Sequence, residues 1–304
     1  MSCLSWNCRG LGNPGTIQEL ANIVRVKAPL AVFLMETWLN EEYLEKVRCY
    51  LHFSSKLVVQ STNKGGGLVL FWNDDFNVSI KSYSNSHIDA IIKDGTEEAW
   101  RLTGVYGAPE THRREETWTL LRHLDRMFQL PWCCIGDFNE IVKMEEMKGR
   151  LARPDRQMRG FRSVLDDCGL VDLRYRGFPF TSCNNRDPPY TTWVRLDRAV
   201  ANMDWLHLFS KARVEHVDVA KSDHKCLWLQ CSHRHTRGTK EDHSNLKKLG
   251  CLMWGAKQLL RKLGRVLNGV QGCSRFGINS RSAKDSWEIG VGRVSGVLNN
   301  KWKW

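Results

Sequence analysis

The strongest constraint on the fold of this 304-residue chain is a set of short, continuously apolar runs. Residues 30–35 and 130–135 each contain six apolar residues in a row, which is about the length of one strand. A strand that is apolar on both sides needs cover on both faces of its sheet. We therefore expect sheets that are buried between other layers.

Helical and strand-like segments alternate along the first three quarters of the chain. The spacing of apolar residues predicts helices, and alternating or continuous apolar runs predict further strands. The expected helices span residues 16–26, 41–49, 111–127 and 157–168, and the other expected strands span 4–6, 57–59, 68–72, 77–80, 88–92, 100–106, 214–219 and 226–229. This order predicts an α/β (α+β) four-layer sandwich with two packed mixed β-sheets flanked by helices.

Charge divides the chain into two parts. Residues 1–232 carry 30 Lys and Arg against 29 Asp and Glu, whereas residues 233–304 carry 15 against 4. We predict a folded domain over 1–232 and a basic, partly disordered C-terminal extension over 233–304, with one amphipathic helix at 246–267. A basic tail suits nucleic acid as a partner, and a merely solvated extension is an alternative of equal weight.

Composition argues against secretion and against a membrane-spanning protein. No stretch reaches the roughly 18 uninterrupted apolar residues of a membrane span, and the first residues resemble a strand rather than a signal peptide. The eleven cysteines are irregularly spaced, and several lie inside apolar runs, which predicts reduced thiols in an intracellular protein. Nothing in the sequence indicates an oligomeric state.

Short polar clusters stand at the ends of four strand-like segments. They contain Asn7, Glu36, Asp137 and His224. Metal-assisted phosphodiester cleavage needs carboxylates, amides and a histidine that converge from separate strand ends. Each residue also has a simpler explanation, since Glu36 could be a solvated strand end and Asn7 a turn residue.

The cluster Gly136-Asp137-Phe138-Asn139 has two interpretations. In an extended segment Asp137 and Asn139 would face the same side, with Phe138 packed inward, and could hold a water and touch a phosphate oxygen. The alternative is an Asx-type turn that closes the strand.

His224 could donate to a phosphate oxygen if a carboxylate held its tautomer and raised its pKa. Asp197 is the best candidate for that partner. A purely structural His224 is the alternative. Tyr106 ends the predicted strand 100–106 and could hydrogen-bond a phosphate or orient a neighbour.

The ordered motif set resembles that of a known family. Its parts are Trp6-Asn7, Glu36-Thr37, Gly104-Val105-Tyr106-Gly107, Gly136-Asp137-Phe138-Asn139, Arg195-Leu196-Asp197-Arg198 and Ser222-Asp223-His224. The order resembles the endonuclease/exonuclease/phosphatase superfamily, which includes pancreatic deoxyribonuclease and the apurinic endonucleases. Residues 4–14, 36–39, 65–68 and 195–199 are most similar to the endonuclease domain of plant LINE-type (non-LTR) retrotransposons. The resemblance covers about residues 1–232 and implies a deoxyribonuclease-like fold.

The resemblance implies a metal site and substrate contacts. It assigns Asn7, Glu36 and Asp223 to Mg²⁺, with Glu36 as the main ligand and Mn²⁺ as the alternative ion. Asp223 would flank the metal or the attacking water. Tyr106 would contact or orient the scissile phosphate, and Thr181 would lie on the substrate side.

The same resemblance implies roles for the remaining residues. Asp137 would orient or deprotonate the attacking water, and Asn139 would support it at the phosphate. His224 would stabilise the transition state, and Asp197 would pair with His224.

Two positions depart from related patterns. Apurinic endonucleases carry an acidic residue where this chain has Arg9, and plant relatives commonly carry Trp where this chain has Ser182. The intact elements continue into a reverse transcriptase, and no Tyr-x-Asp-Asp motif occurs in this sequence. We therefore expect a truncated element or an isolated endonuclease module.

The main hypothesis is a Mg²⁺-dependent endonuclease that nicks DNA, located in the nucleus, with DNA as its partner. One alternative is a phosphatase or phosphodiesterase of the same fold that acts on a small or lipid phosphate. The other is a catalytically silent retrotransposon remnant that at most binds nucleic acid through its basic tail.

Overall fold

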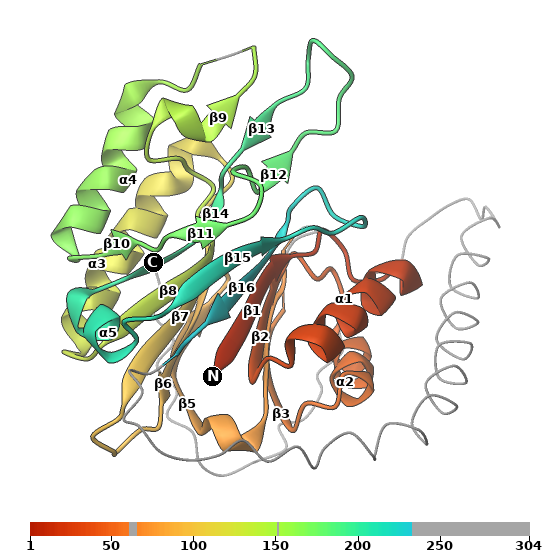
Figure 1. The fold of residues 1–304 in the computed structure, drawn as a ribbon, viewed down its shortest axis with the longest axis vertical. Helices are drawn as coiled ribbons and strands as arrows, with labels where there is room; N and C mark the ends of the chain where they lie inside the picture. Colours follow the sequence, from red (N-terminus) through yellow and green to blue (C-terminus); the bar gives the residue numbers. More distant parts are fainter. Residues whose placement is uncertain (61–65, 151, 233–304) are drawn as a thin grey trace, which may run out of the picture. The chain divides into compact units, whose positions relative to one another are not determined.

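Four layers of secondary structure make up the protein, and they follow the order helices, sheet, sheet, helices (Figure 1). The computed structural model describes residues 1–60, 66–150 and 152–232. The predicted helix at 246–267 and the predicted disorder of 233–304 lie outside the described residues. The division at residue 232 therefore stays a prediction.

The first sheet has seven strands in the order β11-β15-β16-β1-β2-β4-β3. Neighbours are antiparallel except for the parallel pairs β1–β2 and β11–β15. The strands are β1 (Ser2–Asn7), β2 (Ala31–Met35), β3 (Ser55–Val59), β4 (Leu68–Trp72), β11 (Tyr175–Arg176), β15 (Arg213–Val217) and β16 (Cys226–Gln230).

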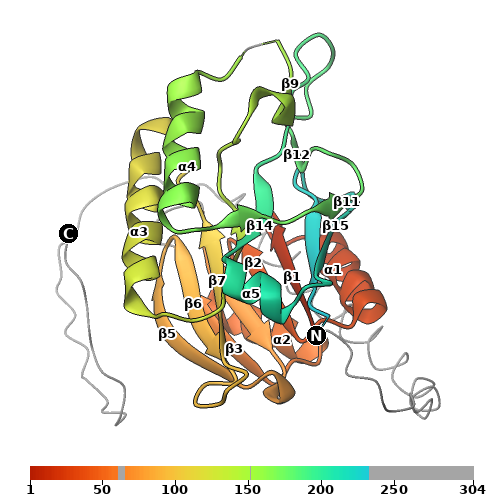
Figure 2. The same ribbon diagram turned by 60° about the vertical axis from the view of Figure 1, so that its left-hand side comes forward.

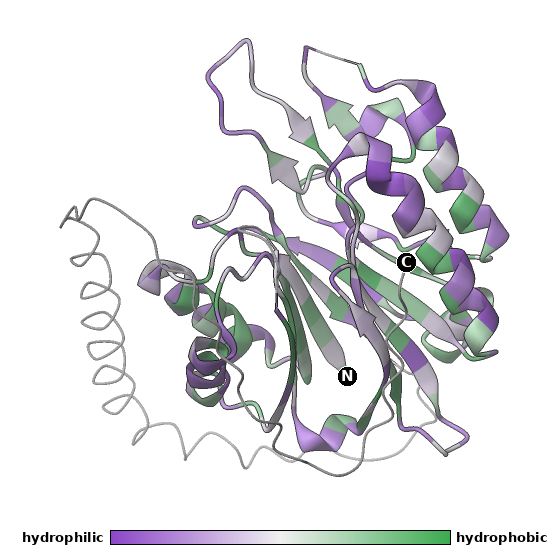
Figure 3. Cartoon of the chain, turned by 180° about the vertical axis from the view of Figure 1, so that it is seen from behind, coloured by the Kyte–Doolittle hydropathy of each residue, from purple (hydrophilic) through white to green (hydrophobic). Residues whose placement is uncertain are grey.

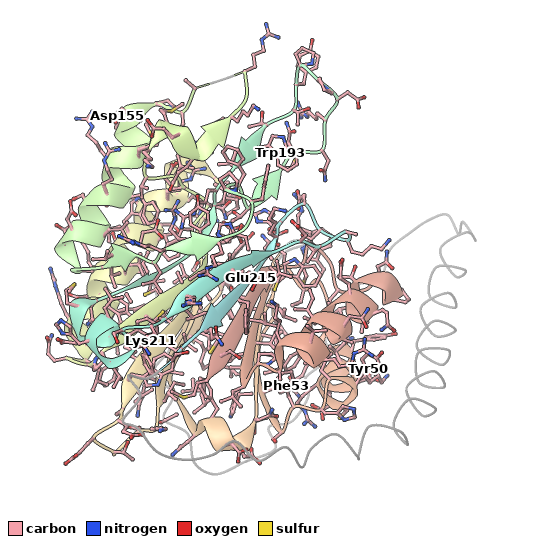
Figure 4. The ribbon with its side chains drawn as sticks, viewed as in Figure 1. Tyr50, Phe53, Asp155, Trp193, Lys211 and Glu215 are labelled. Carbon is pink, nitrogen blue, oxygen red and sulfur yellow. The ribbon has the colours of Figure 1, made fainter. Side chains whose placement is uncertain are left out.

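The second sheet has six strands in the order β10-β14-β8-β7-β6-β5, and only β7 and β8 are parallel. Its strands are β5 (Val78–Ser84), β6 (His87–Ile92), β7 (Trp100–Tyr106), β8 (Trp132–Asp137), β10 (Val171–Asp172) and β14 (Asp197–Ala201). A small third sheet contains β9 (Met147–Lys148), β12 (Ser182–Cys183) and β13 (Trp193–Val194). Figure 4 labels Trp193 on this small sheet.

Helices cover the outer faces of the two large sheets (Figure 2). The α-helices are α1 (Pro14–Lys27), α2 (Glu41–Tyr50), α3 (Arg114–Met127), α4 (Asp155–Asp167) and α5 (Met203–Leu208), and the 3-10 helices are η1 (Asp74–Phe76), η2 (Thr111–Arg113) and η3 (Met144–Glu146). Helices α1 and α2 pack on the first sheet, and α3 and α4 pack on the second. In the described residues, no helix is long and apolar enough to cross a membrane.

Strand β2 confirms the prediction that the apolar runs are buried on both faces. Ala31, Phe33 and Met35 point into the core between the two sheets, whereas Val32 and Leu34 pack under α1 and α2. Successive side chains on a strand point to opposite faces, so a continuous run of this kind fills two cores at once. Figure 3 shows the apolar strands lying between helices whose outer faces are hydrophilic.

Most predicted elements are present, but several of their boundaries differ from the sequence prediction. The expected helix 111–127 begins as η2, and α3 starts at Arg114. Strand β8 runs on through Asp137, and β15 ends at Val217.

Strand β14 and helix α5 were not predicted. The sequence does not indicate β14, because the charged residues Asp197 and Arg198 lie within it and interrupt the apolar pattern. Both side chains are nevertheless buried. Their charges are paired with His224 and Glu146, so a buried strand can contain them.

The two large sheets pack tightly against each other where Gly104 of β7 faces Phe33 of β2. A Cβ atom added at Gly104 would come within 2.6 Å of Phe33 Cδ2. A side chain at this position would force the sheets apart, which explains a glycine inside an otherwise regular strand.

We expect Gly104→Ala to lower the free energy of unfolding by about 1–3 kcal/mol, because it overpacks the core. Urea denaturation measures the change. Adding Phe33→Leu should recover part of the loss, since Leu lacks the ring that the new methyl group meets. Gly12→Ala is the matched control, because its Cβ would lie 3.7 Å from Leu39 Cδ2. Equal stability of the two alanine variants would contradict the prediction.

Candidate active site

The carboxyl ends of two parallel strand pairs bring the predicted residues together. Asn7 ends β1, and Glu36 follows β2, which runs parallel to it. Tyr106 ends β7, and Asp137 ends β8, its parallel neighbour in the other sheet. Parallel neighbours finish at the same edge of a sheet, so four distant segments of sequence meet at one end of the sandwich.

The amide of Asn7 joins the two sheets at this edge. Its Nδ2 donates to Glu36 Oε1 at 2.8 Å and to Asp137 Oδ2 at 3.1 Å. Its Oδ1 accepts the backbone N–H of Arg9 at 3.3 Å. Because Asn7 is fully buried, its hydrogen bonds fix how far apart these two carboxylates lie.

Tyr106 adds a second donor to the same oxygen of Glu36. Its hydroxyl donates to Glu36 Oε1 at 3.1 Å. Burial, followed by the nearby charges of Glu36 and Asp137, raises the pKa of Tyr106 well above its usual value. The hydroxyl therefore keeps its proton and remains a hydrogen-bond donor at neutral pH.

The Asx-type turn, and not the extended segment, describes residues 136–139. Asn139 has φ +54° and its backbone N–H donates to Asp137 Oδ1 at 2.8 Å. The same-face argument is therefore wrong, because it required extended backbone at Asn139. The side chain of Asn139 donates to Gly107 O at 2.9 Å. Phe138 packs inward against Phe161, as predicted.

His224 lies between two buried carboxylates. Its Nδ1 is 2.8 Å from Asp197 Oδ2 and 3.7 Å from Asp137 Oδ2. Burial lowers the pKa of the imidazole, but the charges of Asp197 and Asp137 outweigh that effect and raise the pKa to about 10. The ring is therefore positively charged at neutral pH, and Asp197 holds its Nδ1 proton.

Asp137 is a buried carboxylate, and its pKa is also raised. Burial is the main cause that raises its pKa to about 7, and the neighbouring charge of Asp197 adds to it. His224 and the hydrogen bond from Asn7 act in the other direction. A carboxyl group with a pKa near neutrality can both hold and release a proton under physiological conditions.

Thr181 does not lie where the sequence placed it. Its side chain is 1% exposed, and its hydroxyl accepts the backbone N–H groups of Leu196 at 3.0 Å and Asp197 at 2.9 Å. Thr181 therefore positions Asp197 from behind and does not line the substrate cavity. The neighbouring Ser182 faces the cavity instead, with its hydroxyl 3.2 Å from His224 Nε2.

A cavity of about 430 Å³ opens above these residues. Arg9, Glu36, Tyr106, Asn139, Asp223 and His224 line one part of it. Asn7, Asp137 and Asp197 are buried and do not line the cavity.

The other part of the cavity lining was missed by the sequence reasoning. It includes Cys183, Asn184, Thr192 and Val194, which belong to or adjoin β12 and β13. Two-residue strands have no periodic pattern, so no sequence signal marked these side chains.

The oxygen ligands at the rim fit a divalent metal ion. Glu36 and Asp223 both reach the cavity, and Asp223 Oδ1 is buried without a hydrogen-bond partner among the described residues. Such an unpaired carboxylate oxygen costs free energy unless a cation satisfies it. Carboxylate and amide oxygens are also the ligands that Mg²⁺ and Mn²⁺ prefer.

A second group of possible ligands lies deeper. Asp137, Asp197 and His224 each have one possible ligand atom, and these three atoms lie within 4.8 Å of one another. Since the Nδ1 proton of His224 is held by Asp197, that nitrogen has no free lone pair for a metal. We therefore favour the Glu36 and Asp223 rim as the metal site.

Comparison with known proteins identifies the class. Residues 4–224 match the family described as "Endonuclease/Exonuclease/phosphatase family". The chain belongs to this family, whose enzymes depend on divalent metal ions. No curated protein matches the sequence.

Solved structures confirm the deoxyribonuclease-like fold. One is the endonuclease domain of TRAS1, a telomere-specific non-LTR retrotransposon, with 18% identity and a TM-score of 0.57, covering 78% of this chain and 99% of that one. Another is the 3'-5' exonuclease NExo from Neisseria meningitidis, with 16% identity and a TM-score of 0.59, covering 76% and 99%. A third is an AP endonuclease from Leishmania major, with 13% identity and a TM-score of 0.58, covering 77% and 88%.

We expect Thr181→Val to lower the free energy of unfolding by about 1–3 kcal/mol, because the N–H groups of Leu196 and Asp197 lose their acceptor in a buried place. Thr181→Ser keeps the hydroxyl and should stay close to the parent. Chemical denaturation of the three proteins measures the difference. Equal losses in both variants would contradict the prediction, because Thr181→Ser keeps the hydroxyl that accepts the two N–H groups.

The raised pKa of His224 predicts that the metal-free protein loses stability at alkaline pH. The folded-state pKa of about 10 exceeds the unfolded value of 6.5, so the folded protein binds this proton more tightly. Its contribution is complete below pH 6.5 and disappears as the pH rises through 10.

Between pH 7 and 10 the free energy of unfolding should fall by at most about 1.4 kcal/mol per pH unit from this group. Urea denaturation in EDTA at several pH values measures the slope. His224→Gln cannot titrate and should show a shallower slope. Parallel slopes for the two proteins would refute the shift.

Proposed function

We propose that the protein is a Mg²⁺-dependent endonuclease that nicks DNA and derives from a non-LTR retrotransposon. The observation that carries the proposal is the cavity whose lining includes the Glu36 and Asp223 carboxylates and the positively charged His224. The Nδ1 of His224 lies 3.7 Å from Oδ2 of the buried Asp137. Phosphoryl chemistry needs positive charge at the phosphate oxygens and a base near the attacking water. The fold shared with the TRAS1 endonuclease domain supports the retrotransposon origin.

Each side chain has a separate task in this mechanism. Glu36 and Asp223, with Asn7 Oδ1 as a further oxygen, would hold a divalent ion, which would neutralise charge at the phosphate and lower the pKa of a water. His224 donates from Nε2 to a non-bridging phosphate oxygen, because its Nδ1 is occupied by Asp197.

Asp137 accepts the proton of the attacking water, which its pKa of about 7 permits near neutral pH. Asn139 lines the cavity beside it and supports the water or the phosphate. Tyr106, fixed on Glu36, orients that carboxylate and can contact the phosphate.

Nicking of supercoiled plasmid in Mg²⁺ tests the proposal. The parent should convert supercoiled DNA to the open circle, and EDTA should stop it. Glu36→Ala and His224→Ala should each lower the rate by about 10²–10⁴-fold, because the first removes a ligand of the divalent ion and the second removes a positive charge at the phosphate. Glu97→Ala changes an exposed glutamate and is the matched control.

The other outcomes separate the alternatives. Nicking that persists in both site variants would refute the site assignment. If the parent does not nick DNA but releases phosphate from an inositol phosphate, the protein is a phosphatase of the same fold. If it does neither, it is a silent remnant.

A further inference from the structure

Arg9 reaches every oxygen ligand assigned to the metal, although the mechanism above gives it no role. Its Nη1 lies 2.7 Å from Asp223 Oδ2, and its Nε lies 3.8 Å from Glu36 Oε2. Its backbone N–H donates to Asn7 Oδ1, which is the third oxygen assigned to the metal. One residue thus contacts both carboxylates and the amide.

The backbone holds Arg9 in this position. Residue 9 has φ +43°, which turns the chain sharply after β1. The next residue, Gly10, donates its N–H to Glu36 O at 2.8 Å, so the turn is attached to the segment that carries Glu36. The side chain of Arg9 therefore starts beside the carboxylates and lines the cavity.

Arg9 is always positively charged, but its ion pairs with Glu36 and Asp223 are weak. A guanidinium group stays protonated at any physiological pH, so it neutralises Glu36 and Asp223 whenever no other cation does. The side chain is 48% exposed, and exposed ion pairs contribute little stability. A divalent ion with several oxygen ligands can therefore displace it.

We propose that Arg9 is a built-in counter-ion that competes with the divalent metal for Glu36 and Asp223 and, once displaced, binds a phosphate of the substrate DNA. The second half rests on the proposed function, whereas the first half does not. Displacement leaves a free guanidinium at the wall of the cavity, where its planar donors suit a phosphate group.

Binding of Mn²⁺ to the full chain without DNA, followed by electron paramagnetic resonance, tests the competition. We expect Arg9→Gln to bind Mn²⁺ about tenfold more tightly, because a unit charge close to the site no longer opposes the ion. Arg9→Lys should remain near the parent, since it keeps the charge. Arg25→Gln removes the same charge from an exposed position on α1 and should leave the affinity unchanged.

The outcome that overturns the competition is specific. Unchanged or weaker Mn²⁺ affinity in Arg9→Gln would show that Arg9 does not compete with the ion. As a second measurement, Mn²⁺ should raise the melting temperature of Arg9→Gln more than that of the parent at equal concentration, because tighter binding stabilises the folded state more. A smaller or equal rise would also refute the proposal.

The phosphate contact needs a separate measurement. In a His224→Ala background, which slows cleavage, adding Arg9→Gln should weaken binding of a labelled DNA duplex in saturating Mg²⁺ by about three- to tenfold. Adding Arg25→Gln should weaken it less. Equal effects of the two substitutions would overturn the phosphate contact.

Failure of the proposed function gives a different result. If the parent neither nicks nor binds DNA, the endonuclease proposal fails, while the Mn²⁺ affinities still decide whether Arg9 competes with the metal.

Discussion

The amide of Asn7 is the interaction on which the active-site geometry depends. It is buried at the end of β1 in the first sheet and donates to Glu36 in the same sheet and to Asp137 in the second. Two carboxylates on different sheets are thereby held by one rigid planar group. An unpaired buried amide would be costly, so the hydrogen bonds also favour one relative position of the two sheets at this edge. The two carboxylates joined by Asn7 lie close to the other residues of the site, since Glu36 lines the cavity and Asp137 lies 3.7 Å from His224.

The buried charges of the site are tolerated because opposite charges lie next to one another. Asp137, Asp197 and His224 would each be costly alone, but the positive ring lies between the two carboxylates. Burial and the neighbouring charge of Asp197 raise the pKa of Asp137, and the charges of Asp197 and Asp137 raise the pKa of His224. A site that must present a charged donor to a phosphate and a base to a water can obtain both from this arrangement. Thr181 contributes from behind by fixing the backbone at Asp197.

Much of the fold could be predicted because its strands are buried on both faces. The apolar run at 30–35 predicted β2. Side chains of β2 alternate between two cores, which explains why no polar residue interrupts the run. The missed elements are those whose stability comes from distant partners. Strand β14 contains Asp197 and Arg198, whose charges are compensated only after folding, and β12 and β13 are too short to show a period.

By itself the sequence determined the layered α/β architecture and the chemical types of the site residues, because apolar periodicity and strand-end polar residues are local properties. Tertiary structure alone decided how these residues are used. It showed that Thr181 supports Asp197 and does not line the cavity, that Asn139 closes a turn, and that Arg9 forms ion pairs with Glu36 and Asp223. These roles depend on contacts between segments far apart in the chain, and such contacts exist only once the two sheets have packed together.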